Sequence, residues 1–234
     1  MFDVSVVIPT YQHGHLLERA VYSAIQAGAG EVVIVDDAST DHTERIGRAL
    51  NNTPEILYLR NPFHAGTIYS RNRAVYASTY DLIWPIDADD MALNLQPLVE
   101  AWQPGTWVYG GWRERRIPNH KHLKWTPDVV GFEPPPPGML HSKELGWVTM
   151  LFNKGDWMDV GGYNPVFSIG NEIWAFQRAL VNAGVMPIRV PDCVFERNTD
   201  APQTERARAW HHVIKPLIDD LYPYSEVPIS AIIR

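Results

Sequence analysis

Continuous apolar runs alternate with segments of helical periodicity over the first 90 residues, and this alternation limits the fold more than any other feature. The apolar runs cover 4–8, 32–35, 56–59 and 82–86. Apolar residues recur at helical spacing from Leu16 to Ile25, and further helices are expected up to about Leu50 and from Gly66 to about Ser78. Strands that read as unbroken apolar runs between helices indicate an α/β fold with a mostly parallel sheet covered on both faces.

The start of the second helix has a local signal of its own. Asp41 and Glu44 have the N-cap and N3 spacing of a capping box. We therefore expect the helix that ends near Leu50 to begin at Asp41.

Polar residues stand where each predicted strand ends. They are Thr10 and Tyr11 after Pro9, then Asp36 and Asp37, then Arg60 and Asn61, and finally Asp87 to Asp90. Each group alone could be a turn or a helix cap. The carboxyl ends of parallel strands meet at one edge of the sheet, where α/β proteins bind ligands, so the groups together favour a nucleotide pocket.

The last of these groups is the most informative, because three carboxylates fall within the four residues Asp87-Ala88-Asp89-Asp90. Such a cluster repels itself unless a cation is present, and the usual partner is a hard divalent ion that also carries phosphate oxygens. The cluster therefore predicts a metal-bound phosphorylated substrate. The alternative is an acidic turn that caps the next helix.

Composition narrows the class of protein. The chain of 234 residues can bury one sizeable core, and its net charge of -7 argues against a broad nucleic-acid surface. The single cysteine, Cys193, rules out an internal disulfide and a cysteine-cluster zinc site. No apolar run reaches the roughly 20 residues of a membrane span, and the N-terminus lacks the features of a signal peptide. We therefore expect a cytoplasmic protein without a membrane span.

Four segments, in this order, resemble the motifs of family 2 glycosyltransferases: Val6 to Tyr11, Val33 to Asp41, Gly66 with Ser70-Arg71-Asn72, and Ile86 to Asp90. The likeness covers about residues 2 to 100 and returns at Phe152 and at Gly161-Gly162-Tyr163-Asn164. The resemblance implies a GT-A fold, with a Rossmann-like, mostly parallel sheet flanked by helices. It implies one domain, 1–234, with a nucleotide-sugar-binding half (1–103) and an acceptor-binding half (104–234) that ends in a helix from about Thr204 to Leu221.

The same resemblance implies the activity and the cofactor. It predicts a hexosyltransferase that uses a nucleotide-sugar donor and Mn²⁺ or Mg²⁺ and inverts the anomeric carbon. A UDP- or dTDP-sugar is favoured, and guanosine stays open. The acceptor is open among a saccharide, a protein, a lipid-linked sugar and a modified base, and the oligomeric state is also open.

Residue roles follow from matching the motifs position by position. Tyr11, after Pro9 and Thr10, offers an aromatic face to the base, and Asp36 or Asp37 can accept from a pyrimidine N–H. Arg71 is expected to face the diphosphate, and its alternative is a surface helix arginine. Asp87 is assigned to the ribose or the metal, Asp89 to the cation that bridges the phosphates, and Asp90 to a supporting role.

Inverting transfer also needs a general base. Glu172 aligns with the family's acidic residue, although Asn171 replaces the glutamate expected before it. The alternative for Glu172 is a first-turn residue that interacts with the helix dipole. His211 or His212 could complete the metal site, and a packed or solvated helix histidine is the alternative.

Two other functions compete with this interpretation. A nucleotidyltransferase would need a glycine-rich basic loop after the first strand, which His13-Gly14-His15 does not supply. A nonenzymatic nucleotide-sugar or carbohydrate-binding module is supported by the departure at Asn171 alone.

Overall fold

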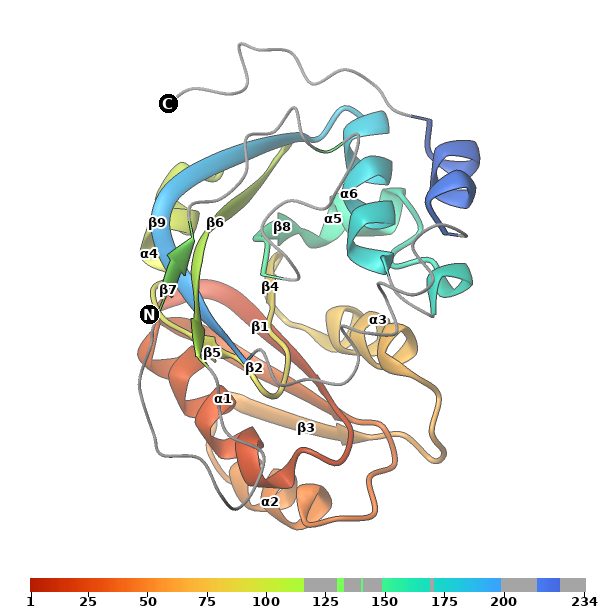
Figure 1. Cartoon of the computed structure of the whole chain (residues 1–234). Helices are drawn as coiled ribbons and strands as arrows, with labels where there is room; N and C mark the ends of the chain where they lie inside the picture. The colour runs from red at the N-terminus through yellow and green to blue at the C-terminus, as the bar shows by residue number, and fades with distance from the viewer. Residues whose placement is uncertain (116–129, 133–139, 141–148, 169–170, 199–213, 224–234) are drawn as a thin grey trace.

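A five-stranded sheet lies at the centre of the chain in a computed structural model (Figure 1). The structure describes residues 1–115, 130–132, 140, 149–168, 171–198 and 214–223. The strand order is β3 (Ile56–Arg60), β2 (Ala29–Asp36), β1 (Phe2–Thr10), β4 (Leu82–Pro85) and β8 (Phe152–Asn153). The first four strands are parallel and β8 is antiparallel to β4. The four predicted strands and their parallel pairing are therefore confirmed.

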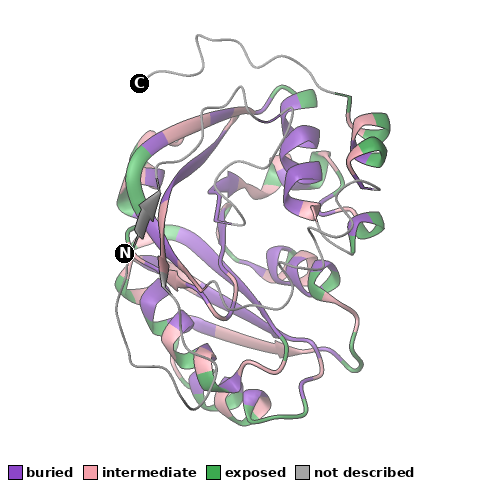
Figure 2. Cartoon of the chain, viewed as in Figure 1, coloured by how far each residue is buried: buried purple, intermediate pink, exposed green. Residues whose placement is uncertain are grey.

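Helices cover both faces of this sheet (Figure 1). One face carries α1 (Gly14–Gln26) and α2 (Thr43–Leu50), and the other carries α3 (Thr67–Ala77), α5 (Lys154–Asp159) and α6 (Glu172–Asn182). Alternate side chains of β1 serve two cores, because Val6 packs in the same cluster as Leu17 while Val7 packs with Ile68. Figure 2 shows β1, β2 and β4 largely buried between these layers, and the edge strand β3 partly exposed. Burial on both faces explains why the strand sequences lack polar alternation.

A second sheet starts directly after the acidic cluster. Its order is β5 (Met91–Ala92), β9 (Met186–Asn198), β6 (Thr106–Arg115) and β7 (Val130–Phe132). In the sequence, α4 (Gln96–Ala101) falls between β5 and β6, and the 3-10 turn η2 (Pro165–Phe167) falls between β8 and β9. β9 is parallel to β6 and antiparallel to β5, so a strand about 100 residues later in the sequence lies beside the acidic loop.

The predicted capping box at the start of α2 is wrong. The helix begins at Thr43, and the N-cap residue is His42 rather than Asp41. The Asp41 carboxylate still accepts the N–H of Thr43, the first residue of the helix, and it also accepts that of Gly14. The carboxylate of Glu44 binds Arg48 and Arg60, so it does not turn back to the helix start.

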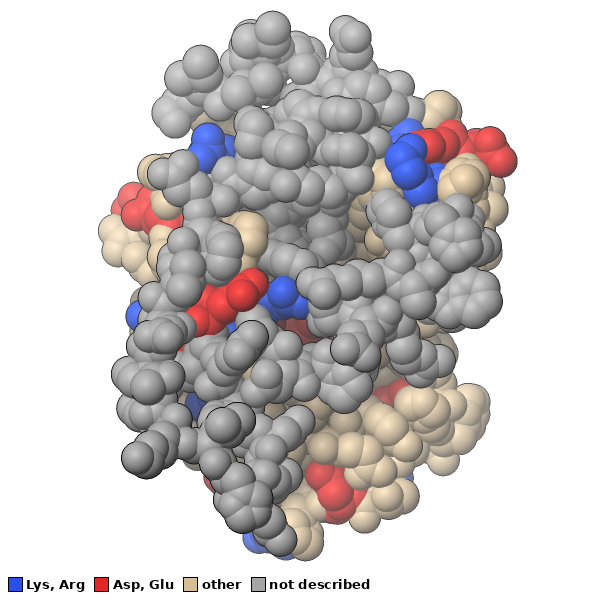
Figure 3. Space-filling view, viewed as in Figure 1, with Lys and Arg blue, Asp and Glu red and all other residues tan. Residues whose placement is uncertain are grey.

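Three further expectations concern the surface charge, a membrane span and the C-terminal helix. On the face shown in Figure 3, Lys and Arg side chains of the described residues lie beside Asp and Glu rather than in one basic patch. None of the helices in the described ranges is long and apolar enough to cross a bilayer. Residues 214–221 are helical, which is the part of the predicted C-terminal helix that falls within those ranges.

Candidate functional site

The polar strand ends predicted from the sequence lie side by side at the carboxyl edge of the sheet. Thr10 is paired with Asp36, and Asp36 with Arg60, in the strand register. The pairing continues one residue further, because the Asp37 N–H donates to the Thr10 carbonyl at 2.9 Å. The parallel register thus brings together groups that are far apart in the sequence.

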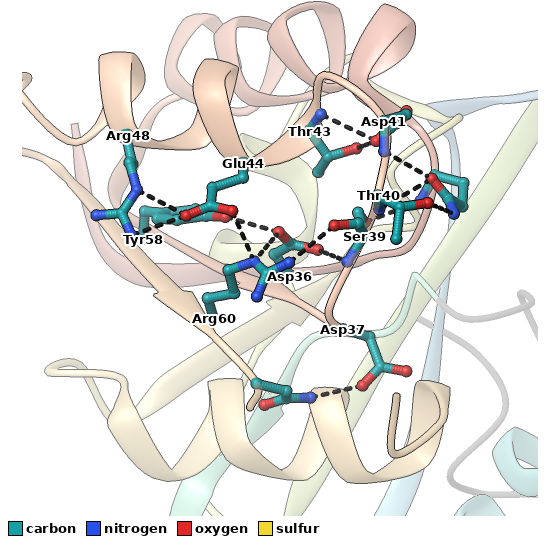
Figure 4. A network of polar contacts seen from close by, with 12 residues as sticks. Asp36, Asp37, Ser39, Thr40, Asp41, Thr43, Glu44, Arg48, Tyr58 and Arg60 are labelled. Carbon is teal, nitrogen blue, oxygen red and sulfur yellow. Dashed lines mark hydrogen bonds and ion pairs between the residues drawn. The ribbon is translucent and has the colours of Figure 1, made fainter. Parts of the chain in front are cut away.

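Asp36 is fully buried and both of its carboxylate oxygens contact the protein (Figure 4). One oxygen accepts the Ser39 N–H at 2.9 Å, and the other accepts the Tyr58 hydroxyl at 2.7 Å and lies 3.3 Å from Nε of Arg60. Burial, together with the hydrogen bond to Asp36, raises the pKa of Tyr58, so its hydroxyl keeps its proton. In this arrangement Asp36 holds the loop after β2 in place.

Asp37 points the other way, toward the start of α3 (Figure 4). Its Oδ1 accepts from the Asn61 side-chain amide at 2.7 Å and from the Ala65 N–H at 2.9 Å. Its Oδ2 accepts the Gly66 N–H at 2.8 Å and lies 2.7 Å from Nδ1 of His64. Burial raises the pKa of Asp37, but the hydrogen bonds from Ala65, Asn61 and Gly66 outweigh it and the net shift is downward. Asp37 is therefore a carboxylate that fixes the loop before α3.

The residues at the end of β1 lie at the same edge. Tyr11 is 41% exposed, and its ring centroid lies 4.2 Å from that of His64. Pro9 is buried and paired with Val35. The Thr10 hydroxyl is buried, and no hydrogen-bond partner for it exists among the described residues.

Arg71 joins two residues that the sequence assigned to different roles. Its guanidinium donates from Nη1 to Oε1 of Glu172 at 2.9 Å and from Nη2 to Oδ1 of Asp87 at 3.0 Å. The side chain is only 2% exposed, so the alternative of a surface helix arginine is wrong. Burial lowers the pKa of Arg71, but Asp87 and Glu172 raise it more, so the group stays charged. One buried cation therefore holds the end of the β4 strand against the start of α6.

Tyr163 supports this arrangement from the Gly-Gly-aromatic turn. The Arg71 guanidinium lies 5.3 Å from the centroid of the Tyr163 ring, within cation–π range. Asn72 donates to the Tyr163 carbonyl at 2.8 Å and accepts its N–H at 2.9 Å. Two motifs separated by 91 residues are thus joined through a pair of reciprocal hydrogen bonds.

Of the other two aspartates of the acidic cluster, Asp89 is half-buried and Asp90 is buried. Burial and the charge of Asp87 raise the pKa of Asp89. Asp90 accepts the Asn198 N–H at 2.8 Å, and burial together with Asp89 and Asp87 raises its pKa well above the usual range. Asp90 thus links the acidic loop to β9, in keeping with the supporting position expected for it.

The donor chemistry at Asp87 and Asp89 fits a divalent cation. Both offer hard carboxylate oxygens, and their mutual repulsion is of the kind that such an ion relieves. The described part of the chain contains no group of three or more His, Cys, Asp or Glu side chains that could hold a metal. His211 and His212 lie outside the described residues. Of the residues expected to hold the metal, Asp87 and Asp89 are the two described ones, and they lie close enough for the charge of one to act on the other.

Left-handed backbone conformations adjoin three of these site residues. Gln12, Ala38 and Asn171 have φ of 59°, 61° and 64° and directly neighbour Tyr11, Asp37 and Glu172. Such a conformation costs roughly 1–2 kcal/mol for most residues and is found preferentially at functional sites. Asparagine tolerates it better than glutamate does, which gives a physical reason for Asn171 at the N-cap of α6.

Three residues at this edge were not predicted from the sequence. His64 contacts Asp37 and Tyr11, Arg19 donates to the Asp89 carbonyl at 2.6 Å, and the Asn198 N–H binds Asp90. His64 could have been noted from its place between the third strand and the third helix. The other two contacts depend on the packing of α1 and β9, which no local pattern encodes.

Comparison with known proteins matches the chain to one family. A family model described as glycosyl transferase family 2 matches residues 5–158. Succinoglycan biosynthesis protein ExoU of Rhizobium meliloti (strain 1021) is 36% identical over 90 residues, which are 38% of this chain and 26% of that protein. The matched segment thus spans about a quarter of that relative's length.

Solved structures with the same fold bind nucleotides or nucleotide sugars. Mannosyltransferase PcManGT from Pyrobaculum calidifontis, in complex with GDP-Man and Mn²⁺, aligns with a TM-score of 0.69 at 18% identity over 98% of this chain and 67% of its own. S. aureus TarS 1-349 aligns with a TM-score of 0.65 at 15% identity over 96% of this chain and 67% of its own. TarS 1-349 has also been solved with UDP and with UDP-GlcNAc. These likenesses confirm the predicted GT-A fold.

Proposed function

Because this chain belongs to glycosyl transferase family 2, we propose that it transfers a hexosyl group from a nucleotide diphosphate donor to an acceptor hydroxyl, with inversion and with Mn²⁺ or Mg²⁺. The observation that carries the proposal is the buried contact of Arg71 with both Asp87 and Glu172. Through this contact, one buried arginine side chain holds both Asp87, which we expect to bind the donor side, and Glu172, which we expect to contact the acceptor.

The donor side is built from the carboxyl edge of the sheet. We assign the exposed face of Tyr11 to the base, with Pro9 and Thr10 shaping the wall beside it. Asp37 is the carboxylate available for a base N–H, and Asp36 acts through the loop that it holds. A UDP- or dTDP-sugar is the donor that we favour, since uracil and thymine both carry a ring N–H.

The metal side consists of Asp87 and Asp89. These two carboxylates would hold a cation together with oxygens of the donor diphosphate, and that ion would neutralise the charge of the leaving group. Arg71 acts here by fixing the orientation of Asp87. The proposal includes His211 or His212 as a further ligand of the metal ion.

Glu172 is the residue that we propose as general base. Its Oε1 accepts from Arg71, which orients the carboxylate, and Oε2 is the atom that we assign to the acceptor hydroxyl. As the acceptor oxygen bonds to the anomeric carbon, its proton passes to Glu172 and the bond to the diphosphate oxygen breaks with its electron pair. The acceptor stays open among the four classes considered from the sequence.

Donor cleavage and transfer with a panel of nucleotide sugars test this function. With Mn²⁺ present, the wild-type chain should release nucleoside diphosphate from one donor, and Glu172→Gln should bind that donor without cleaving it. Binding without cleavage or transfer in the wild type would favour a nonenzymatic module. Release of pyrophosphate from a nucleoside triphosphate and a sugar phosphate would favour a nucleotidyltransferase.

A further inference from the structure

His64 makes the two contacts that the donor base is proposed to make. It lies in the loop between β3 and α3, with Nδ1 2.7 Å from Oδ2 of Asp37. Its ring centroid is 4.2 Å from that of Tyr11, with 31° between the ring planes. The imidazole therefore covers part of the aromatic face and contacts the carboxylate assigned to the base.

The position of the proton follows from the chemistry of Asp37. An ionised carboxylate only accepts hydrogen bonds, so the hydrogen between the two side chains belongs to Nδ1 of His64. The hydrogen bonds that lower the pKa of Asp37 keep it ionised. His64 thus presents a flat ring with an N–H directed at a carboxylate, which is also the chemistry of uracil at N3.

His64 is the donor to Asp37 that can leave most easily. The other three donors are the backbone N–H groups of Ala65 and Gly66, at the start of α3, and the amide of Asn61. Asn61 is buried, whereas the His64 side chain is 57% exposed. Rotation of His64 into water would free one acceptor position on Oδ2 without opening the core.

We propose that His64 is an internal surrogate of the donor base, which occupies the base site in the nucleotide-free chain and is displaced by a base that carries a ring N–H. The inference rests on the proposed function and names its donor class more closely. Uracil and thymine can replace the His64 N–H at Asp37. Cytosine presents a ring nitrogen lone pair at the same position, which the Asp37 carboxylate repels.

Binding of UDP and CDP to the whole chain, measured by calorimetry at fixed Mn²⁺, tests the proposal. His64→Ala should bind UDP about three- to tenfold more tightly, because the hydrogen bond of His64 to Asp37 and its ring contact with Tyr11 no longer compete with the base. The preference for UDP over CDP should persist, since Asp37 is unchanged. His42→Ala is the matched control, because His42 is also exposed, makes no side-chain cap, and should leave both affinities unchanged.

Unchanged or weaker UDP binding by His64→Ala would overturn the proposal, and so would equal affinity of the wild type for UDP and CDP. A second measurement needs no variant. The ring-proton resonances of His64 should shift when UDP saturates the wild type, because the ring leaves Tyr11, and resonances that do not move would also overturn it. A wild type that binds no nucleotide at all would instead refute the proposed function.

Discussion

Replacing Arg71 by lysine tests the link between the two carboxylates. Arginine reaches Glu172 and Asp87 with two different nitrogens, whereas lysine has one, so Arg71→Lys should lose at least one charge-assisted hydrogen bond. Such a bond contributes about 1.5–3 kcal/mol. Asp87 is 42% exposed and regains water, so we expect the lower end, about 1.5 kcal/mol of unfolding free energy.

The effect on catalysis should exceed the effect on donor binding. A single ammonium cannot hold both carboxylates in the geometry set by the guanidinium, so Glu172 also loses its fixed orientation, and a misplacement of about 1 Å can cost roughly 10²-fold in rate. Urea unfolding measures the loss of stability, and initial-rate kinetics measure kcat and KM for the donor. Arg48→Lys is the control, because Arg48 makes an exposed pair with Glu44 that should contribute little to stability. An Arg71→Lys variant with wild-type stability and kcat would show that the buried contact has no role in positioning.

Three further predictions concern the carboxylates. Glu172→Gln should lower kcat by about 10²–10⁴-fold, as loss of a general base does, while the dissociation constant of the donor changes little in calorimetry. Because the pKa of Asp89 is raised, Mn²⁺ affinity should begin to weaken at a higher pH on acidification than an ordinary aspartate would cause, which a metal titration across pH measures. The pKa of Asp90 is raised in the folded chain, so its ionisation disfavours folding and metal-free stability should fall as pH rises above the unfolded pKa. Asp90→Asn keeps an acceptor for Asn198 and should flatten that fall in urea unfolding; an equally steep fall would contradict the assignment.

The sheet could be predicted from the sequence because burial on both faces leaves a local trace. Val6 and Val7 enter different cores, so neither face of β1 could carry polar residues, and the run is continuous. The convergence of Thr10, Asp36 and Arg60 followed from the parallel register alone. Features set by the direction and pairing of the strands could therefore be predicted from the sequence.

Contacts between distant segments could not be predicted in the same way. Arg71 and Glu172 are 101 residues apart, and their contact depends on how α6 packs over α3. The capping box failed because the Glu44 carboxylate binds Arg48 and Arg60, while the Asp41 N–H donates to the side chain of Gln12. The role of His64 depends on the loop that Asp37 folds, which spacing along the chain does not reveal.

Metal-dependent donor binding tests the central claim most directly, since it asks whether the acidic loop and the sheet edge form one nucleotide-sugar site. Calorimetry of the favoured donor should show binding that Mn²⁺ strengthens and EDTA reverses in the wild type, with no Mn²⁺ effect in Asp89→Ala. Equal donor affinity of the wild type with Mn²⁺ and after EDTA treatment would contradict the account.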